Sequence, residues 1–331
     1  MHEQRQPGIF FIPPILLLAS CLVNAFELQG HRGARGLMPE NTLPGFARAL
    51  SLGVDVLEMD AAITADGVVV LSHDPQLDPA LTRGPDGRWI TDDDHVISRL
   101  EFADLRRFDV GRINPASAYA KQFKTQTPAD GSPVPSLFEV AALADRAGNR
   151  RVRFNIETKV RPDRPELTVA PELFADRLVA AIRDAGIAQR ATVQSFYWRT
   201  LDRVRAVAPE IATACLTSER DWLDNIGRGR GLSPWTGEDV LKFGGSVPRL
   251  VEGAGCAIWS PHFAEVNDAL IDEAHALGLR VIVWTVNAPN DMIRLIQSGV
   301  DGIITDYPDR LGAVMQSLGM PLPAATPVSA R

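Results

Sequence analysis

From Phe26 onward, short apolar runs alternate with stretches in which apolar residues recur at helical spacing. This alternation is typical of parallel strands joined by crossover helices. Several helical stretches end at a glycine, as at Gly53 and Gly148, which commonly terminates a helix before the next strand. Eight strands are predicted, at residues 26–31, 54–60, 152–158, 191–196, 211–216, 256–260, 280–286 and 301–305. The pattern therefore predicts an α/β fold, a TIM (β/α)₈ barrel, with chemistry at the C-terminal ends of its strands.

Two segments depart from this alternation. Residues 76–135 are rich in Pro, Gly, Asp and Thr and contain the turn signal Gly84–Gly87, so an inserted subdomain over the barrel mouth is expected there. The end of the chain, residues 318–331, is expected to be a disordered tail. The barrel domain is accordingly predicted to span residues 26–317.

The first 25 residues have the pattern of an export signal. Arg5 precedes an apolar stretch, and Val23-Asn24-Ala25 suits the small-residue cleavage rule. Pro13 and Pro14 interrupt the apolar stretch, which is too short and broken for a membrane span. Alternatively, residues 18–21 resemble a lipobox, with Cys21 lipidated. Either interpretation predicts a protein that works outside the cytoplasm, in the periplasm or secreted.

Composition narrows the class of protein. With 45% hydrophobic and 23% charged residues, the chain has the makeup of a soluble globular protein with a large core. A net charge of −7 opposes any role that depends on neutralising nucleic-acid phosphates. After removal of the signal only Cys215 and Cys256 remain. They could pair in an oxidising compartment, but their apolar surroundings favour two buried free thiols.

Three acidic residues at predicted strand ends are candidate metal ligands. Glu58 and Asp60 stand two apart on one strand, so both side chains project to the same side, and Glu157 ends the next barrel strand. Carboxylates this close repel each other unless a cation neutralises them. Oxygen ligands without a nearby cysteine favour Ca²⁺ or Mg²⁺. The same acids can instead form a structural salt-bridge network with Arg32, Arg35 or Lys159.

His31 and His73 are candidates for proton transfer. A histidine titrates near neutrality, so two of them on opposite sides of a scissile bond can accept and donate protons. Arg32 and Lys159 offer a guanidinium fork and a point charge for phosphate oxygens. Weaker candidates for the pocket or for support of the site are Glu40, Asn41, Phe196 and Trp284.

An ordered set of sequence blocks from Gly30 to Asp309 resembles the glycerophosphodiester phosphodiesterase family. The blocks are "HRGARGLMPENT", "GVDVLEMDAAITADGVVVLSHDP", "FDVGR", "VPSLFEV", "FNIETK", "VQSF", "AHALGLRVIVWTVN" and "GVDGIITDYPD". The resemblance implies a TIM-barrel hydrolase that splits glycerophosphodiesters into glycerol 3-phosphate and an alcohol. With its signal-like start, the chain would be similar to the exported bacterial enzymes of this family, which are often calcium-dependent.

Carried over by position, the resemblance assigns a role to each candidate. It makes His31 and His73 the general acid and base, without saying which is which. It makes the metal ligands Glu58, Asp60 and Glu157, and the phosphate contacts Arg32 and Lys159. Two other functions fit the same pattern, a related phospholipase D-like enzyme acting on lysolipid head groups and a barrel that binds phosphate esters without turnover.

Overall fold

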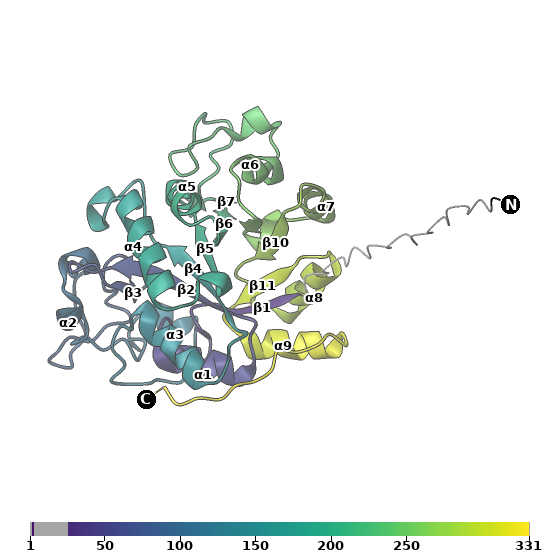
Figure 1. Cartoon of the computed structure of the whole chain (residues 1–331). Coiled ribbons are helices and arrows are strands. Elements are labelled where there is room, and N and C mark those ends of the chain that lie inside the picture. The colour runs from purple at the N-terminus through teal and green to yellow at the C-terminus, as the bar shows by residue number, and fades with distance from the viewer. Residues whose placement is uncertain (1, 3–25, 331) are drawn as a thin grey trace.

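The computed structural model describes residue 2 and residues 26–330, and its central feature is a closed parallel barrel ringed by helices (Figure 1). β1 (Glu27–Gly30) closes the barrel by pairing in parallel with β2 (Val56–Ile63) and β11 (Gly302–Thr305). The other barrel strands follow β2 in the order β4 (Arg153–Thr158), β5 (Ala191–Ser195), β6 (Ala212–Thr217), β9 (Ile258–Pro261) and β10 (Arg280–Val283). All eight predicted strands are present, and the TIM-barrel prediction is confirmed.

Helices connect the strands and form the outer layer. Thr42 caps the first of them by accepting the Gly45 N–H, and Ser136 forms a capping box with Glu139 at the start of the third. The helices are α1 (Leu43–Leu52), α2 (Phe102–Leu105), α3 (Leu137–Arg146), α4 (Pro171–Asp184), α5 (Trp198–Val207), α6 (Val247–Gly253), α7 (Asp268–Ala276), α8 (Pro289–Gln297) and α9 (Pro308–Ser317). Directly after β6, β7 (Glu219–Arg220) and β8 (Leu223–Asp224) form a small hairpin.

Strand pleating sorts side chains between two environments. On β2, Leu57 and Met59 belong to the large core between barrel and helices. Glu58 and Asp60 alternate with them and therefore face the barrel interior. Deeper in the interior, a small apolar cluster fills part of the barrel; its members are Ala214, Ile258, Ile282 and Ile304. The acids thus lie inside the barrel because their neighbours in sequence are packed outside it.

The segment expected as an insertion lies between the second barrel strand and its helix. β3 (Val69–Leu71) first pairs antiparallel with the end of β2. The following residues carry an apolar cluster of their own, which includes Leu77, Ile97 and Phe108. Near the barrel mouth, the Gln126 amide donates to the Arg35 carbonyl at 2.8 Å. The segment therefore braces the loop that follows β1.

The C-terminal segment lies against the barrel. Residues 320–330 form no helix or strand. However, the Thr326 N–H donates to the Leu50 carbonyl at 2.8 Å, and Asn149 Nδ2 donates to Thr326 Oγ1 at 3.1 Å. These contacts lie at the last turn of α1, before β2, and in the loop before β4, on the face of the barrel opposite the strand C-termini. The segment expected to be disordered is therefore held to the bottom of the barrel.

Cys215 and Cys256 form a disulfide, so the expectation of two free thiols is wrong. Cys215 lies on β6, and Cys256 lies two residues before β9. These strands are hydrogen-bonded neighbours, which brings the two Cα atoms to 5.9 Å although the cysteines are 41 residues apart. An apolar sequence context indicates burial, but it carries no information about which strands are adjacent.

Removing this disulfide is expected to lower the free energy of unfolding. Closing a loop of this length restricts the unfolded chain, which corresponds to a stabilisation of about 3–4 kcal/mol. The measurement is urea unfolding of the Cys215→Ala, Cys256→Ala double variant beside the oxidised wild-type protein. Equal unfolding midpoints would show that the cross-link contributes nothing.

Apart from residue 2, the predicted export signal lies outside the described residues, and so does the lipidation site predicted at Cys21. Among the residues that the structure does describe, no helix is both long enough and apolar enough to cross a bilayer.

Candidate active site

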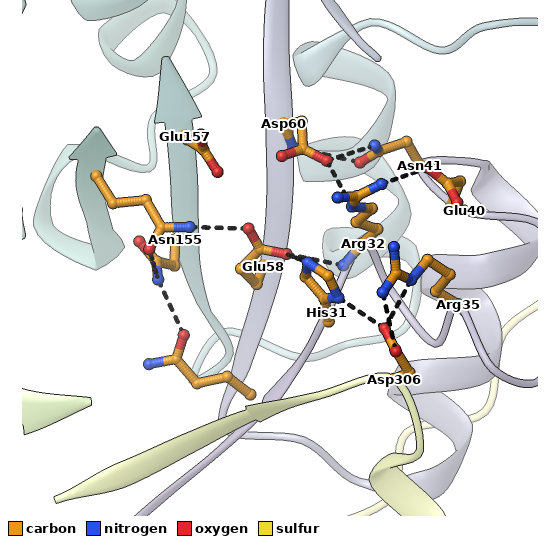
Figure 2. Close-up of polar contacts among 12 residues, drawn as sticks. His31, Arg32, Arg35, Glu40, Asn41, Glu58, Asp60, Asn155, Glu157 and Asp306 are labelled. Carbon is orange, nitrogen blue, oxygen red and sulfur yellow. Dashed lines mark hydrogen bonds and ion pairs between the residues drawn. The ribbon is translucent and has the colours of Figure 1, made fainter. Parts of the chain in front are cut away.

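Three carboxylates converge at the C-terminal end of the barrel (Figure 2). Glu58 and Asp60 come from β2, and Glu157 comes from the adjacent strand β4, where it is in register with Asp60. All three residues are buried, and one oxygen from each lies within 4.8 Å of the others. The convergence expected from their spacing is therefore present.

Basic residues contact two of these acids. Arg32 Nε lies 3.0 Å from Asp60 Oδ2, and Lys159 Nζ lies 2.9 Å from Glu157 Oε1 and 3.6 Å from Asp60 Oδ1. Burial alone would raise the pKa of Asp60, but the positive charges of Arg32 and Lys159 outweigh it and hold the pKa well below its usual range. The salt-bridge network considered as an alternative to a metal site thus exists around Asp60 and Glu157.

Glu58 has no Lys or Arg side chain as a partner within the described part of the chain. Its Oε2 accepts the Arg32 backbone N–H at 2.8 Å, and its Oε1 accepts Gln194 Nε2, also at 2.8 Å. Burial and the neighbouring negative charge of Asp60 raise the pKa of Glu58 well above its usual range. A cation at this position would favour the ionised carboxylate.

Two observations fit a hard divalent cation between the three acids. Asp60 Oδ1 is buried without a hydrogen bond among the described residues. The buried carboxylates at the site also outnumber the basic groups around them. The carboxylates are those of Glu40, Glu58, Asp60, Glu157 and Asp306. The basic partners are Arg32, Arg35 and Lys159. The excess of two negative charges, when all are ionised, equals the charge of one divalent ion, and carboxylate oxygens suit Ca²⁺ or Mg²⁺.

The chain makes a tight turn at the end of β1 that depends on glycine. Arg32 has a φ of +50° and Gly33 a φ of +86°. A side chain at Gly30 would place its Cβ 2.2 Å from the Gly33 carbonyl oxygen, so this turn requires glycine there. The tight turn directs the Arg32 N–H at Glu58 and leaves His31 at the rim of the barrel.

His31 is anchored by an acid from the other end of the chain. Its Nδ1 lies 2.6 Å from Asp306 Oδ1, which follows β11. Arg35 and Asn287 hold the same carboxylate at 2.7 Å each. Burial and the positive charge of Arg35 lower the pKa of His31 to about 4, against the opposing effect of Asp306. At neutral pH the ring is therefore uncharged, and with Nδ1–H donated to Asp306 its Nε2 lone pair faces the site, 3.9 Å from Glu58 Oε2.

His73 occupies a more open position after β3. Its side chain is 34% exposed, and its Nδ1 lies 3.0 Å from Asp74 Oδ1. His31 and His73 line the same cavity, whose volume is about 370 Å³. The structure thus brings both histidines to one cavity together with Glu58, Glu157 and Lys159.

The residues expected as support surround Arg32. Glu40 Oε1 accepts Arg32 Nη1 at 2.6 Å, and the Tyr119 hydroxyl from the insertion donates to the other Glu40 oxygen. Asn41 Nδ2 donates to Asp60 Oδ2 at 2.8 Å. Glu40 and Asn41 therefore hold charged groups of the site in place rather than line its cavity.

The far wall of the cavity is apolar and aromatic. Phe196 and Trp284 meet edge to face with ring centroids 5.3 Å apart, as expected for a pocket wall. Trp222 and Trp235 line the same cavity and were not predicted. Trp222 lies in the turn of the β7–β8 hairpin and is 62% exposed. Its position in a polar stretch, "SERDWLDN", is the signal that could have identified it, because an exposed tryptophan there serves no core.

Comparisons with known proteins agree with this geometry. The sequence profile of the Glycerophosphoryl diester phosphodiesterase family matches residues 31–310. A glycerophosphodiester phosphodiesterase of Caldanaerobacter subterraneus is 26% identical, over 85% of this chain and 94% of its own length. A crystal structure of a candidate glycerophosphoryl diester phosphodiesterase from Silicibacter pomeroyi DSS-3 is 34% identical with a TM-score of 0.79, covering 91% of this chain and 96% of its own.

A third relative is similar in fold. An Oleispira antarctica phosphodiesterase, solved in complex with sn-glycerol-3-phosphate, superposes with a TM-score of 0.62 at 22% identity, covering 87% of this chain and 96% of its own.

Proposed function

Because the chain belongs to the glycerophosphoryl diester phosphodiesterase family, we propose that it hydrolyses glycerophosphodiesters to glycerol 3-phosphate and an alcohol. The observation that carries the proposal is the buried cluster of Glu58, Asp60 and Glu157 beside His31, in a cavity at the C-terminal ends of the barrel strands. In this fold, chemistry takes place at that face.

A single divalent cation, Ca²⁺ or Mg²⁺, is part of the proposal, with Glu58, Asp60 and Glu157 as its ligands. When bound, the cation supplies stabilisation of the negative charge that grows on phosphate oxygens in the transition state. Arg32 and Lys159 line the cavity beside these acids and would contact the remaining phosphate oxygens.

The two histidines have different surroundings, which supports different roles. His31 is neutral at pH 7 and has its Nδ1 fixed on Asp306, so its Nε2 suits a general base. It would take a proton from a water molecule that attacks phosphorus, or from the glycerol hydroxyl of the substrate. In the second case the hydroxyl forms a cyclic phosphate, which water must open in a further step to give glycerol 3-phosphate. His73 would then protonate the departing alkoxide, and its open position would let it exchange protons with solvent.

The substrate assay tests this assignment. Purified protein is incubated with glycerophosphocholine, glycerophosphoethanolamine and lysophosphatidylcholine, and both glycerol 3-phosphate and the free choline or ethanolamine are measured. We expect release from the first two substrates. Turnover of lysophosphatidylcholine alone would favour the lysolipid enzyme, and tight binding without turnover would favour a phosphate-ester-binding barrel.

The aromatic wall is expected to hold the leaving alcohol. Replacing Trp222 by alanine should raise KM for glycerophosphocholine by roughly 2- to 30-fold with kcat little changed, since an aromatic face attracts a quaternary ammonium group by about 0.5–2 kcal/mol. The effect on bis(glycerol) phosphate should be smaller. Leu241→Ala, another exposed apolar side chain, is the control. Equal changes for both substrates would exclude a role of Trp222 in recognising the alcohol.

Export from the cytoplasm is also proposed. The Cys215–Cys256 disulfide supports it, because such bonds persist in oxidising compartments. The signal-like residues 1–25 support it as well, with lipidation at Cys21 as the alternative to cleavage after Ala25.

A further inference from the structure

A continuous line of buried polar side chains crosses the barrel interior below the acids. At its lower end, Glu27 Oε2 accepts Gln29 Nε2 at 2.8 Å. Asn155 Nδ2 then donates both to Gln29 Oε1 at 3.0 Å and to Gln194 Oε1 at 2.9 Å. At the upper end, Gln194 Nε2 donates to Glu58 Oε1 at 2.8 Å. All five residues are buried, and they come from four different strands.

The hydrogen bonds along this line fix the orientation of each amide group. Carboxylates at both ends act as acceptors, so each glutamine must turn its NH₂ group outward and its carbonyl toward the middle. Asn155 therefore has to donate in both directions, and its own Oδ1 remains buried without a hydrogen bond among the described residues. With Asn155 turned over, its carbonyl would face two other carbonyls. The structure thus leaves a buried acceptor unsatisfied, which costs stability, and keeps a donor pointing at Glu58.

The lower end of the line is fixed by charge. Glu27 Oε1 accepts Arg153 Nη1 at 2.5 Å, and Arg280 pairs with the same oxygen. Both arginines belong to barrel strands, so Glu27 is held at the bottom of the barrel. Because Glu27 is fixed, the hydrogen bonds through Gln29, Asn155 and Gln194 also fix the amide that donates to Glu58. Figure 2 shows Asn155 beside Glu58, its register partner on the neighbouring strand.

We propose that Gln194 is a positioning residue for the divalent cation. Its N–H holds Glu58 Oε1, and with the Arg32 N–H on Oε2 it fixes the plane of this carboxylate toward Asp60 and Glu157. Asn155 acts one step further away by fixing the Gln194 amide. Hydrogen bonds of this kind set the direction of metal-binding carboxylates. The inference rests on the proposed function, and it gives a role to the glutamine of the "VQSF" block.

The test is cation binding by isothermal titration calorimetry, with Ca²⁺ and Mg²⁺ each added alone to chelated protein. Gln194→Met keeps the side-chain length but removes the donor. We expect cation affinity to fall roughly 10- to 100-fold. At saturating cation, kcat should return to near the wild-type value with KM for the diester unchanged, because Gln194 contacts no reacting atom in this account.

Two further variants separate positioning from general destabilisation. Ser260→Ala removes a buried hydrogen bond of the same barrel, from Ser260 Oγ to the Ile282 carbonyl at 2.8 Å, and should leave cation affinity unchanged. Asn155→Leu frees the Gln194 amide while leaving both hydrogen-bond donors of Glu58 in place, and should weaken cation binding in the same direction as Gln194→Met. If Gln194→Met does not fold, the cation affinity of Asn155→Leu is measured in its place.

The outcomes distinguish this inference from the function on which it rests. Wild-type affinity in Gln194→Met, or in Asn155→Leu where that variant carries the test, would overturn the positioning role while leaving the cation site in place. So would a loss no larger than that of Ser260→Ala. A wild-type protein that hydrolyses the diester but binds neither cation would overturn both the cation site and the inference.

Discussion

Replacement of His31 by alanine is expected to lower kcat by roughly 10²- to 10⁴-fold, the range typical for loss of a general acid or base. The His31 ring is neutral at pH 7, and Asp306 holds its Nδ1 at 2.6 Å, so its Nε2 is available to accept a proton. No other described side chain places an imidazole in that position. Circular dichroism and calorimetric cation binding should remain close to wild type. The measurement is steady-state release of glycerol 3-phosphate at saturating cation.

A matched substitution controls for loss of an imidazole elsewhere. His275 is exposed on α7 and pairs with Asp301 at 2.9 Å, away from the cavity, so His275→Ala should keep normal turnover. Asp306→Asn should also lower kcat, because the partner that fixes the ring tautomer is lost. Near-normal turnover in His31→Ala would contradict the assignment of this histidine to proton transfer.

Glu58→Gln is expected to weaken cation binding by roughly 100-fold or more, at least the loss seen when a residue that merely orients a ligand is removed. Turnover should fall with it and recover in part at high cation concentration. Calorimetry and activity measured over the same cation series test this. Unchanged binding would assign Glu58 to the salt-bridge network instead. Glu252→Gln, an exposed change on α6, is the control and should change neither.

Glu58→Gln should also stabilise the cation-free protein. Burial, reinforced by Asp60, raises the pKa of Glu58, so the folded chain retains a proton that the unfolded chain releases. The contribution of Glu58 to stability is therefore full below the ordinary carboxyl pKa and declines as pH rises above it. Glu58→Gln lacks this decline. Thermal unfolding in chelator at pH 7 should give a higher melting temperature than wild type, and a lower one would contradict the raised pKa.

Local pattern was sufficient to predict that most residues of the candidate site lie together. The two-residue period of a strand places Glu58 and Asp60 on one face, and the order of strands in a barrel makes the strand with Glu157 their neighbour. His31 follows from its position at the end of the first strand. These residues depend on contacts within one strand or between successive barrel strands, which the sequence encodes directly.

The rest depends on contacts that only the closed barrel creates. Asp306 meets His31 because β11 pairs with β1, across 275 residues of sequence. Gln194 reaches Glu58 across the barrel interior, from a strand that is not hydrogen-bonded to β2. Trp222 enters the cavity wall through a hairpin too short to have a strand pattern. In each case the residue type was visible, but its partner was not.

The central claim is that one divalent cation, held by Glu58, Asp60 and Glu157, supports hydrolysis of a glycerophosphodiester. The most direct test is to titrate chelated protein with Ca²⁺ or Mg²⁺ while measuring bound cation and the release of glycerol 3-phosphate from glycerophosphocholine. The account predicts no release without cation and a rise that saturates when one cation is bound per chain. Full release from protein that retains no cation would contradict it.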